Sequence, residues 1–319
     1  MDRELALELV RVTEAAAMTS ARWMGLGNKE EADGAAVDAM RRMFDTVQIR
    51  GTVVIGEGEI DEAPMLYIGE KVGCGGGPEV DVAVDPVEGT NLVAKGLPNS
   101  IAVIGVAARG CLLHAPDMYM EKIAVGPCAA GKVNLDYSPA ENIAAVAKAS
   151  NKDIRDLVVV ILDRPRHEKI IYEVRQAGAR VKLISDGDVA AAVSAAVAGS
   201  GVDMLLGIGG APEGVLAAVA LKCLGGEIQG RLCPESAAQE ERIISMGIAN
   251  PRQLLTMDNL VRGEDCFFAA TGITDGDLVR GVRFHGHVAS THSIVMRYQS
   301  GTIRYIEATH NLKRKPHVF

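Results

Sequence analysis

Short apolar runs alternate with helix-length segments between residues 157 and 224, and this alternation restricts the possible folds more than any other feature of the sequence. Three strands are expected, at 157–162, 181–184 and 202–208, and the helices that follow them are expected at 166–176, 188–198 and 212–224. Strands that alternate with helices of this length are typical of parallel α/β units. We therefore expect a parallel sheet in the second half of the chain.

The rest of the chain has a different order of elements. Two helices come first, at 3–24 and 28–47, and Asn28 is expected to be the N-cap of the second. The period then changes to that of strands, at 51–55, 80–84, 100–108 and 122–125. After residue 265 an antiparallel sheet is predicted, with strands at 266–271, 282–288, 293–298 and 302–308. We place the join between two halves, 1–150 and 151–319, within 139–155.

Two of the expected strands end in acidic residues flanked by glycine or proline. The strand at 80–84 runs into Asp85, where Pro86 is expected to stop the ladder, and Glu88 follows three residues on. Gly89 permits a tight turn, and the backbone N–H groups after it can hold a phosphate oxygen. Because a strand end places such side chains in a cleft, two carboxylates and the hydroxyl of residue 90 can converge there.

The strand at 51–55 ends in a similar way. Glu57 lies between two glycines, Glu59 follows it, and Asp33 is expected on the second helix. A single acid at a strand end is most often a solvated turn residue. Two such ends in one α/β chain nevertheless indicate an acidic metal site. Carboxylate oxygens are hard ligands, and they suit Mg²⁺ or Mn²⁺ rather than zinc.

Composition argues against several classes of protein. The chain has 41 acidic and 33 basic residues, a formal net charge of −8 and no basic stripe, so a nucleic-acid partner is not expected. No apolar run approaches the ~20 residues that a membrane span needs, and residues 1–24 do not resemble a signal peptide. The 6 cysteines show no CxxC spacing, which indicates reduced thiols in the cytoplasm. An anionic substrate would need local cations or metal ions.

Besides an enzyme with an acidic metal site, two further classes of function stay open. Residues 207–214 (GIGGAPEG) follow a strand and open a helix, which favours an NAD-binding oxidoreductase, although Pro212 replaces the third glycine of that fingerprint. A catalytically inactive sugar-phosphate sensor is the other alternative. The complete set of acids argues against a sensor, because a binding protein does not need so many metal ligands around one phosphate.

The acidic motifs resemble those of a known group of enzymes. DPVEGTN at 85–91, GEGE at 56–59 and Asp33 together resemble the lithium-sensitive, metal-dependent phosphatase superfamily, which includes inositol monophosphatases and fructose-1,6-bisphosphatases. The chain departs from the usual pattern, with Glu88 in place of Asp and GGAPEG at 209–214 in place of a Trp-Asp motif. These departures are similar to the class II (bacterial) fructose-1,6-bisphosphatases. The resemblance covers most of the chain, through further segments at 32–41, 53–70, 96–104, 116–123, 162–167 and 185–189.

This resemblance implies a fold, a reaction and partners. The fold is α/β (α+β), a layered α/β/α/β/α sandwich of the inositol monophosphatase/fructose-1,6-bisphosphatase type. The reaction is metal-dependent hydrolysis of the 1-phosphate of fructose 1,6-bisphosphate, a step of gluconeogenesis. In a close alternative the enzyme also cleaves sedoheptulose 1,7-bisphosphate. The implied partners are the sugar bisphosphate, Mn²⁺ or Mg²⁺, and further copies of the chain in a dimer or tetramer.

The resemblance also implies roles for individual residues. One metal would be held by Asp33 and Glu57, and a second by Asp85, Glu88 and Glu213, with Glu59 as an accessory. Thr90, oriented by Asp33, would act on the attacking water. Most metal ligands thus fall in the half 1–150, and Glu213 in the half 151–319. The residues expected to contact the sugar and its phosphates are Glu88, Gly89, Thr90, Tyr119, Arg164, Pro165, Arg166, Asp186, Gly187, Asp188 and Gly210.

Overall fold

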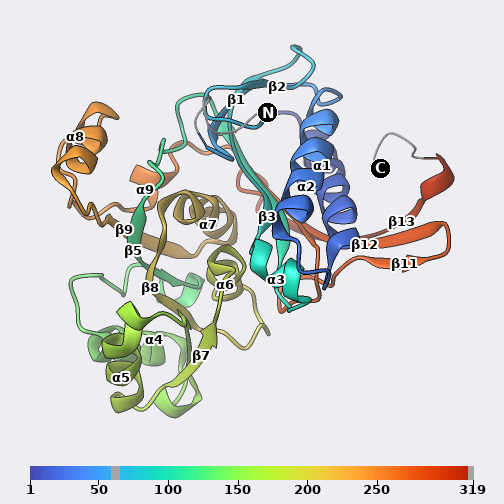
Figure 1. Cartoon of the computed structure of the whole chain (residues 1–319). Coiled ribbons are helices and arrows are strands. Elements are labelled where there is room, and N and C mark those ends of the chain that lie inside the picture. The colour runs from blue at the N-terminus through green and yellow to red at the C-terminus, as the bar shows by residue number, and fades with distance from the viewer. Residues whose placement is uncertain (59–64, 315–319) are drawn as a thin grey trace. The chain divides into compact units, whose positions relative to one another are not determined.

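The computed structural model of the chain describes residues 1–58 and 65–314 and divides into two compact units. Unit 1 consists of Met1–Leu112 and Gly263–Phe319, and unit 2 of Leu113–Arg262 (Figure 1). The division differs from the expected halves, because the segment assigned to the join forms helix α4 (Pro139–Ser150) inside unit 2. The side chain of Ser138 caps this helix by accepting from the Glu141 N–H at 3.3 Å, in a reciprocal capping box.

Unit 1 is built on one mixed sheet that joins the start of the chain to its end. Its strands are β1 (Arg50–Ile55), β2 (Lys71–Val72), β3 (Glu79–Glu88), β4 (Ile101–Ala108), β10 (Cys266–Gly272), β11 (Arg283–His285), β12 (Val288–Arg297) and β13 (Thr302–Asn311). Their order is β11-β12-β10-β4-β3-β1-β2, with β13 on β12. β1 and β3 pair in parallel, and the C-terminal strands pair antiparallel. The predicted antiparallel C-terminal sheet is therefore confirmed, and it continues into β4 through β10.

Helices cover one face of this sheet. They are α1 (Leu5–Ser20) with the short η1 (Ala21–Trp23), α2 (Lys29–Phe44) and α3 (Thr90–Lys95). Figure 1 shows α1 and α2 side by side against β3, where alternate strand residues such as Val82 and Val84 enter one core with Leu9 and Met40. The Asn28 side chain accepts from the Glu31 N–H at 3.2 Å, which confirms the predicted N-cap.

Unit 2 has a second mixed sheet, and it confirms the parallel α/β units predicted there. The strands are β5 (Tyr119–Val125), β6 (Val158–Leu162), β7 (Arg180–Ile184), β8 (Met204–Gly210) and β9 (Glu227–Leu232), in the order β7-β6-β8-β5-β9. β6 pairs in parallel with β7 and β8, whereas β5 is antiparallel to β8 and β9. The helices after the strands are α5 (Glu168–Gln176), α6 (Asp188–Ser194), α7 (Ala211–Leu224), α8 (Ala237–Ser245) and α9 (Met257–Leu260).

Alternate residues of the unit 2 strands face different helices. Ile123 and Ile161 enter a core cluster with Ile143 of α4 and Val174 of α5. Val160, one position along β6, packs instead with Ala195 just after α6. Helices therefore cover both faces of the sheet, and the predicted α/β class is confirmed.

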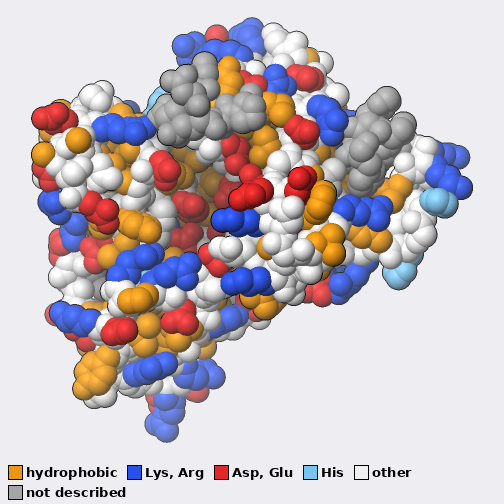
Figure 2. Space-filling view, in the orientation of Figure 1, with side chains coloured by type: hydrophobic (Ala, Val, Ile, Leu, Met, Phe, Trp, Pro, Cys, Tyr) orange, Lys and Arg blue, Asp and Glu red, His pale blue; other side chains and the backbone are white. Residues whose placement is uncertain are grey.

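The surface of the described residues agrees with the charge balance of the sequence. On the face shown in Figure 2, the side chains of Lys and Arg are interspersed with those of Asp and Glu and form no single basic patch. Among the described residues, none of the helices has the length and apolar character needed to cross a membrane.

Candidate functional site

The end of β3 carries two of the expected metal ligands. Asp85 pairs with Val103 of β4 and Glu88 with Ile101, so three steps on β3 oppose two on β4, which is a β-bulge. The prediction that Pro86 ends the strand is wrong, because the bulge removes the need for a ladder N–H at that position. The bulge leaves Glu88 3% exposed, while Asp85 Oδ1 accepts from the Val87 N–H at 3.0 Å.

The turn after β3 has the tight conformation that was expected from Gly89. Gly89 has φ +85°, in the left-handed region that glycine tolerates, and it is the N-cap of α3. Thr90 is the first residue of α3, which packs against α2, the helix that carries Asp33. No residue of the described ranges hydrogen-bonds the Thr90 hydroxyl, which leaves it available to a substrate or a water.

Asp33 and Glu57 are brought together by α2 and the loop after β1. Their carboxyl groups share a hydrogen bond. Burial raises the pKa of Glu57 to about 8, and the negative charge of Asp33 adds to this shift. Burial also raises the pKa of Asp33, although its hydrogen bond with Glu57 lowers it in part. The pair therefore holds a proton at neutral pH, which a bound cation would displace.

The loop that carries Glu57 is held by residues that the sequence analysis did not identify. The Glu57 N–H donates to the Leu66 carbonyl at 3.1 Å. The Leu66 N–H in turn donates to the Glu70 carboxylate, which also accepts from Arg41 Nε at 2.5 Å. Arg41 lies on α2, so this chain of hydrogen bonds links the Glu57 loop to the helix of Asp33. The predicted accessory ligand Glu59 lies outside the described residues.

The expected ligands are distributed over both units. Asp33, Glu57, Asp85 and Glu88 belong to unit 1, and Glu213 belongs to unit 2. Within residues 1–58 and 65–314, no three Asp, Glu, His or Cys side chains form a ready metal-binding group. The structure thus brings one pair of expected ligands into contact, Asp33 with Glu57, and places Asp85 and Glu88 on one strand end.

The expected sugar and phosphate contacts of unit 2 gather at one edge of its sheet. Residues 164–166 follow β6, residues 186–188 follow β7, and Gly210 ends β8. Tyr119 begins the antiparallel β5 and pairs with Gly210. The carboxyl ends of parallel strands form the usual ligand-binding edge of an open α/β sheet, most of all where neighbouring strands connect in opposite directions.

Both arginines of this edge are oriented by neighbours rather than left as solvated helix residues. Arg164 Nη2 donates to Asp186 Oδ1 at 3.1 Å, which joins the loops after β6 and β7. The Arg166 guanidinium lies 4.5 Å from the centre of the Tyr119 ring and donates from Nη2 to the Ile208 carbonyl at 2.8 Å. Such a planar, pre-oriented fork suits a phosphate group.

His167, directly after these arginines, holds the same loop through both of its ring nitrogens. Its Nδ1 contacts the Leu162 carbonyl at 2.7 Å, and its Nε2 accepts from the Ile208 N–H at 2.8 Å. Burial lowers its pKa, which favours the neutral ring that this pair of contacts requires. The loop of 164–166 is therefore tied to the ends of both β6 and β8.

Glu213 and Asp188 both press against the backbone at the end of β8. A Cβ on Gly210 would lie 1.9 Å from Glu213 Oε2, and a Cβ on Gly209 would lie 2.0 Å from Asp188 Oδ2. Glu213 Oε2 is buried and has no hydrogen-bond partner among the described residues. Burial raises the pKa of Glu213, and the charge of Asp188 raises it further. A buried carboxylate oxygen without a partner is what an absent cation would leave.

Lys122 is a member of this group that the sequence analysis missed. Its Nζ donates to Asp188 Oδ2 at 2.5 Å and to the Gly210 carbonyl at 2.8 Å. The signal available in the sequence was a single lysine within the apolar run of β5. The run alone gives no indication of which acid it meets.

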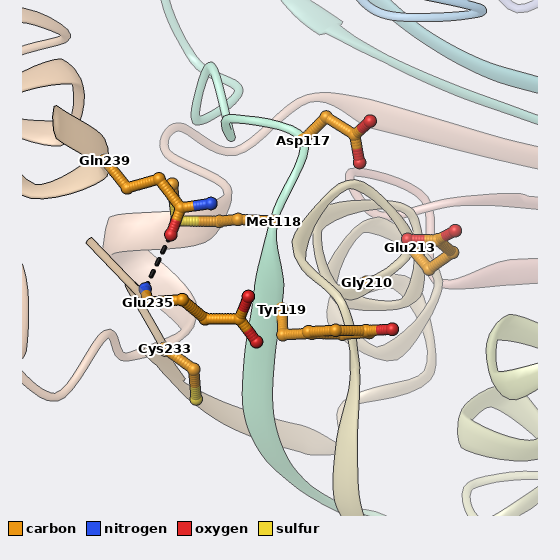
Figure 3. A pocket seen from close by; sticks show the side chains of 8 residues that line it. All are labelled: Asp117, Met118, Tyr119, Gly210, Glu213, Cys233, Glu235 and Gln239. Atoms are coloured by element: carbon orange, nitrogen blue, oxygen red, sulfur yellow. Dashed lines mark hydrogen bonds between the residues drawn. The ribbon is translucent and has the colours of Figure 1, made fainter.

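A cavity of ≈390 Å³ opens beside this edge (Figure 3). The residues that line it belong to unit 2, and they are Asp117, Met118, Tyr119, Gly210, Glu213, Cys233, Glu235 and Gln239. The Gln239 side chain accepts from the Glu235 N–H at 2.6 Å. A cavity with a few convergent polar groups on a sheet edge has the size and character of a small-molecule site.

The glycine-rich turn at 207–214 does not offer the open glycine surface that a dinucleotide needs. The Glu213 carboxylate occupies the space next to Gly210 where a pyrophosphate would approach. The partner of β8 on one side is the antiparallel β5, whereas the first strand of a dinucleotide-binding unit has parallel neighbours. The turn therefore supports a carboxylate ligand better than it supports NAD.

Comparison with known proteins identifies close relatives of the chain. A model of the family described as "Bacterial fructose-1,6-bisphosphatase, glpX-encoded" matches residues 3–310. The D-fructose 1,6-bisphosphatase class 2/sedoheptulose 1,7-bisphosphatase of Synechococcus sp. (strain JA-3-3Ab) is 48% identical over 334 residues, 97% of this chain and 96% of that protein. The protein of the same name from Synechocystis sp. (strain ATCC 27184 / PCC 6803 / Kazusa) is 49% identical over 343 residues, covering 100% and 99%.

Proposed function

The chain belongs to the family of bacterial, glpX-encoded fructose-1,6-bisphosphatases, and from this premise we propose that it hydrolyses the 1-phosphate of fructose 1,6-bisphosphate to give fructose 6-phosphate and inorganic phosphate. The chain is thus a phosphoric monoester hydrolase. The feature of its own residues that best supports this reaction is the half-buried pair Asp33 and Glu57, whose carboxyl groups raise the cost of each other's negative charge.

We propose a second substrate, sedoheptulose 1,7-bisphosphate. The relatives that align with nearly the whole chain carry both activities in their names. The two sugars differ by one carbon between the phosphates. The cavity of ≈390 Å³ beside Tyr119 and Gly210 is large enough for a small sugar.

The family is one of phosphatases that depend on a divalent metal, and we propose Mn²⁺ or Mg²⁺ as that metal. Asp33 and Glu57 would hold one ion, and Asp85, Glu88 and Glu213 a second. The donor set is made only of oxygens, and Glu213 offers a buried oxygen with no partner among the described residues. When bound, the ions would neutralise phosphate charge and increase the acidity of a nearby water.

We assign the remaining chemical work at the reacting phosphate to the turn after β3. The Thr90 hydroxyl would orient the attacking water, or take its proton while passing its own proton to Asp33 on the neighbouring helix. Glu88 and the backbone of Gly89 and Thr90 would hold the phosphate. The water oxygen forms a bond to phosphorus as the bond to the sugar oxygen breaks in line, and the sugar oxygen takes up a proton from solvent.

We assign recognition of the sugar and of the distal phosphate to the unit 2 edge. Arg164, Pro165 and Arg166 would bind the distal phosphate, because Arg166 is already oriented by Tyr119 and by the Ile208 carbonyl. Asp186, Gly187, Asp188 and Gly210 would contact sugar hydroxyls. Fixing these groups before the substrate arrives reduces the entropy that binding must offset.

A phosphate-release assay on a panel of sugar phosphates tests this function. Fructose 1,6-bisphosphate and sedoheptulose 1,7-bisphosphate should release one phosphate each with Mn²⁺ or Mg²⁺, and fructose 6-phosphate should release little. EDTA should abolish the reaction, and either ion should restore it. Full activity after exhaustive chelation would refute the metal requirement, and release from monophosphates alone would refute the substrate.

We further propose that the enzyme works in the cytoplasm as a homodimer or homotetramer. The scattered cysteines support the reducing compartment. Light scattering coupled to size-exclusion chromatography gives the mass of the assembly, for which one chain is 33.7 kDa.

A further inference from the structure

A buried lysine of unit 2 has no part in the function proposed above. Lys122 lies within β5, and its side chain is 3% exposed. Lysine is almost never buried to this extent unless it is paired, because an ammonium group loses its hydration there. The position of Lys122 therefore needs an explanation in terms of what it contacts.

The Lys122 ammonium joins three elements of the binding edge. It donates to Asp188 Oδ2 at 2.5 Å and to the Gly210 carbonyl at 2.8 Å. Asp188 lies in the first turn of α6, and Gly210 is the N-cap of α7. One ammonium group thus ties β5 to the start of two helices.

The glycines at the end of β8 let two carboxylates approach the same piece of backbone. A Cβ built on Gly209 would lie 2.0 Å from Asp188 Oδ2 and 3.0 Å from Lys122 Nζ. Glu213 Oε2 lies 1.9 Å from the corresponding point of Gly210. The position of this backbone therefore sets the spacing between the Asp188 and Glu213 carboxylates.

We propose that Lys122 is a positioning residue for the phosphatase reaction, a role that rests on the function proposed above. Its ammonium fixes Asp188, a sugar ligand, relative to Glu213, a metal ligand, by holding the Asp188 carboxylate and the Gly210 carbonyl together. Lys122 touches neither the reacting phosphate nor the sugar. Because an ammonium is itself a cation, its charge alone opposes metal binding near Glu213, whereas its positioning effect favours it.

Because the charge of Lys122 and its positioning effect change metal affinity in opposite directions, the metal affinity of a Lys122 variant distinguishes them. In Lys122→Met the side chain keeps most of its length and loses its charge and its donors. We expect calorimetric Mn²⁺ affinity to fall about five-fold or more and KM for fructose 1,6-bisphosphate to rise about ten-fold or more. Lys222→Met is the matched control, since Lys222 is also buried in unit 2 and donates to the Val261 carbonyl at 2.8 Å. The control should lose thermal stability while Mn²⁺ affinity and KM stay within about two-fold.

Two further variants keep the test valid if Lys122→Met folds poorly. Lys122→Gln retains hydrogen-bond donors without the charge, and we expect intermediate values of KM. The double variant Lys122→Met/Asp188→Asn removes both buried charges, so it should recover thermal stability while Mn²⁺ affinity stays lowered. Recovery of Mn²⁺ affinity together with stability would show that Lys122 is only structural.

The remaining outcomes also decide the matter. A Lys122→Met protein that binds Mn²⁺ more tightly than the wild type would show that Lys122 acts by charge alone and would overturn the proposal. Values no different from those of Lys222→Met would overturn it as well. If the wild-type enzyme releases no phosphate from fructose 1,6-bisphosphate, the proposed function fails, while Mn²⁺ calorimetry on the lysine variants still tests Lys122.

Discussion

One acidic pair of unit 1, Asp33 and Glu57, and one pair of unit 2, Asp186 and Asp188, have opposite surroundings. In unit 1, Asp33 and Glu57 hydrogen-bond each other, and in the part of the chain that the structure describes neither forms an ion pair with Lys or Arg. In unit 2, Asp188 is paired with Lys122 and Asp186 with Arg164, at 2.5 Å and 3.1 Å. Among the described residues, Asp33 and Glu57 therefore lack a counter-charge, whereas Asp186 and Asp188 each have one.

This difference separates two tasks that acidic residues perform. Two buried carboxyls in contact are costly when both are charged, so they favour a cation from outside and suit metal binding. An acid that is already neutralised by a lysine or arginine gains little from a metal, but it is held in one orientation. The Asp33–Glu57 pair thus has the character of a metal site, and the edge with Asp186 and Asp188 that of a region for orienting an anionic sugar.

The largest effect on the rate of catalysis should come from a residue of unit 1 that is neither a metal ligand nor charged. Thr90→Ala should lower kcat by roughly 10²-fold, the usual scale for a positioned proton-transfer group, because Thr90 is proposed to act on the water. Mn²⁺ affinity and KM should stay within a few-fold. Thr90→Ser, which keeps the hydroxyl, serves as the control in steady-state kinetics. Near-normal kcat in Thr90→Ala would leave this residue as an ordinary start of α3.

The pair Asp33 and Glu57 should make the stability of the metal-free enzyme depend on pH. The pKa of Glu57 is about 8 in the folded protein, above its value of 4.5 when exposed. Stability from its proton is therefore full below pH 4.5 and is lost as pH rises through 8. We expect the EDTA-treated enzyme to lose up to about 4 kcal/mol of unfolding free energy between pH 5 and pH 8.5.

Glu57→Gln isolates this effect, because its amide does not titrate over that range. Urea unfolding at several pH values should give a flatter profile for the variant than for the wild type, both without metal. Saturating Mn²⁺ should flatten the wild-type profile too, because the ion replaces the proton. Identical profiles for the two metal-free proteins would contradict the role of this pair.

Metal affinity should depend on the acids of unit 1. Asp85→Ala should weaken Mn²⁺ binding by about ten-fold or more, on the order of 1.4 kcal/mol, because it removes a charged ligand. Asp81→Ala is the control on the same strand, since the Asp81 carboxylate accepts from the Leu112 N–H at 3.1 Å. Calorimetry should show normal Mn²⁺ affinity for the control despite its lower stability. Normal affinity in Asp85→Ala would remove Asp85 from the ligand set.

The smallest effect should come from the orienting edge of unit 2. Arg166→Ala should raise KM for fructose 1,6-bisphosphate several-fold and change kcat less, because it removes ground-state binding of the distal phosphate. Arg155→Ala, at an exposed ion pair with Asp153 in the same unit, should change neither constant. A collapse of kcat at unchanged KM would mean that Arg166 acts on the reacting phosphate, and the division of tasks between the units would be reversed.

The sequence was sufficient for most of the fold because its strands and helices are strongly periodic. The α/β alternation of 157–224 and the C-terminal strands were predicted from periodicity alone. α4 was missed because residues 139–155 were assigned to the join between the halves, and β9 because polar residues interrupt its short apolar pattern. The bulge at Pro86 was missed because it depends on how β4 pairs with β3.

The candidate site was only partly predictable, for a related reason. Acids at strand ends carry a local signal, so Glu57, Asp85 and Glu88 could be proposed from motifs, whereas Asp33 on α2 and Glu213 on α7 needed the resemblance. The groups that hold these acids in position carry no such local signal. Lys122 meets Asp188 across 66 positions and Arg41 meets Glu70 across 29, and nothing local in the sequence selects those partners.

The pairing of β4 with β10 has a consequence for how the chain is made. β4 ends at Ala108, and its partner begins at Cys266, after the roughly 150 residues of unit 2 have been synthesised. At about 5–20 residues per second, the nascent chain carries β4 with an open edge for on the order of 8–30 seconds. An exposed strand edge is a site for pairing with other chains. A high level of expression should therefore favour aggregates of incomplete chains, because it raises the concentration of chains that carry this open edge, and a lower level should increase the yield of the native enzyme.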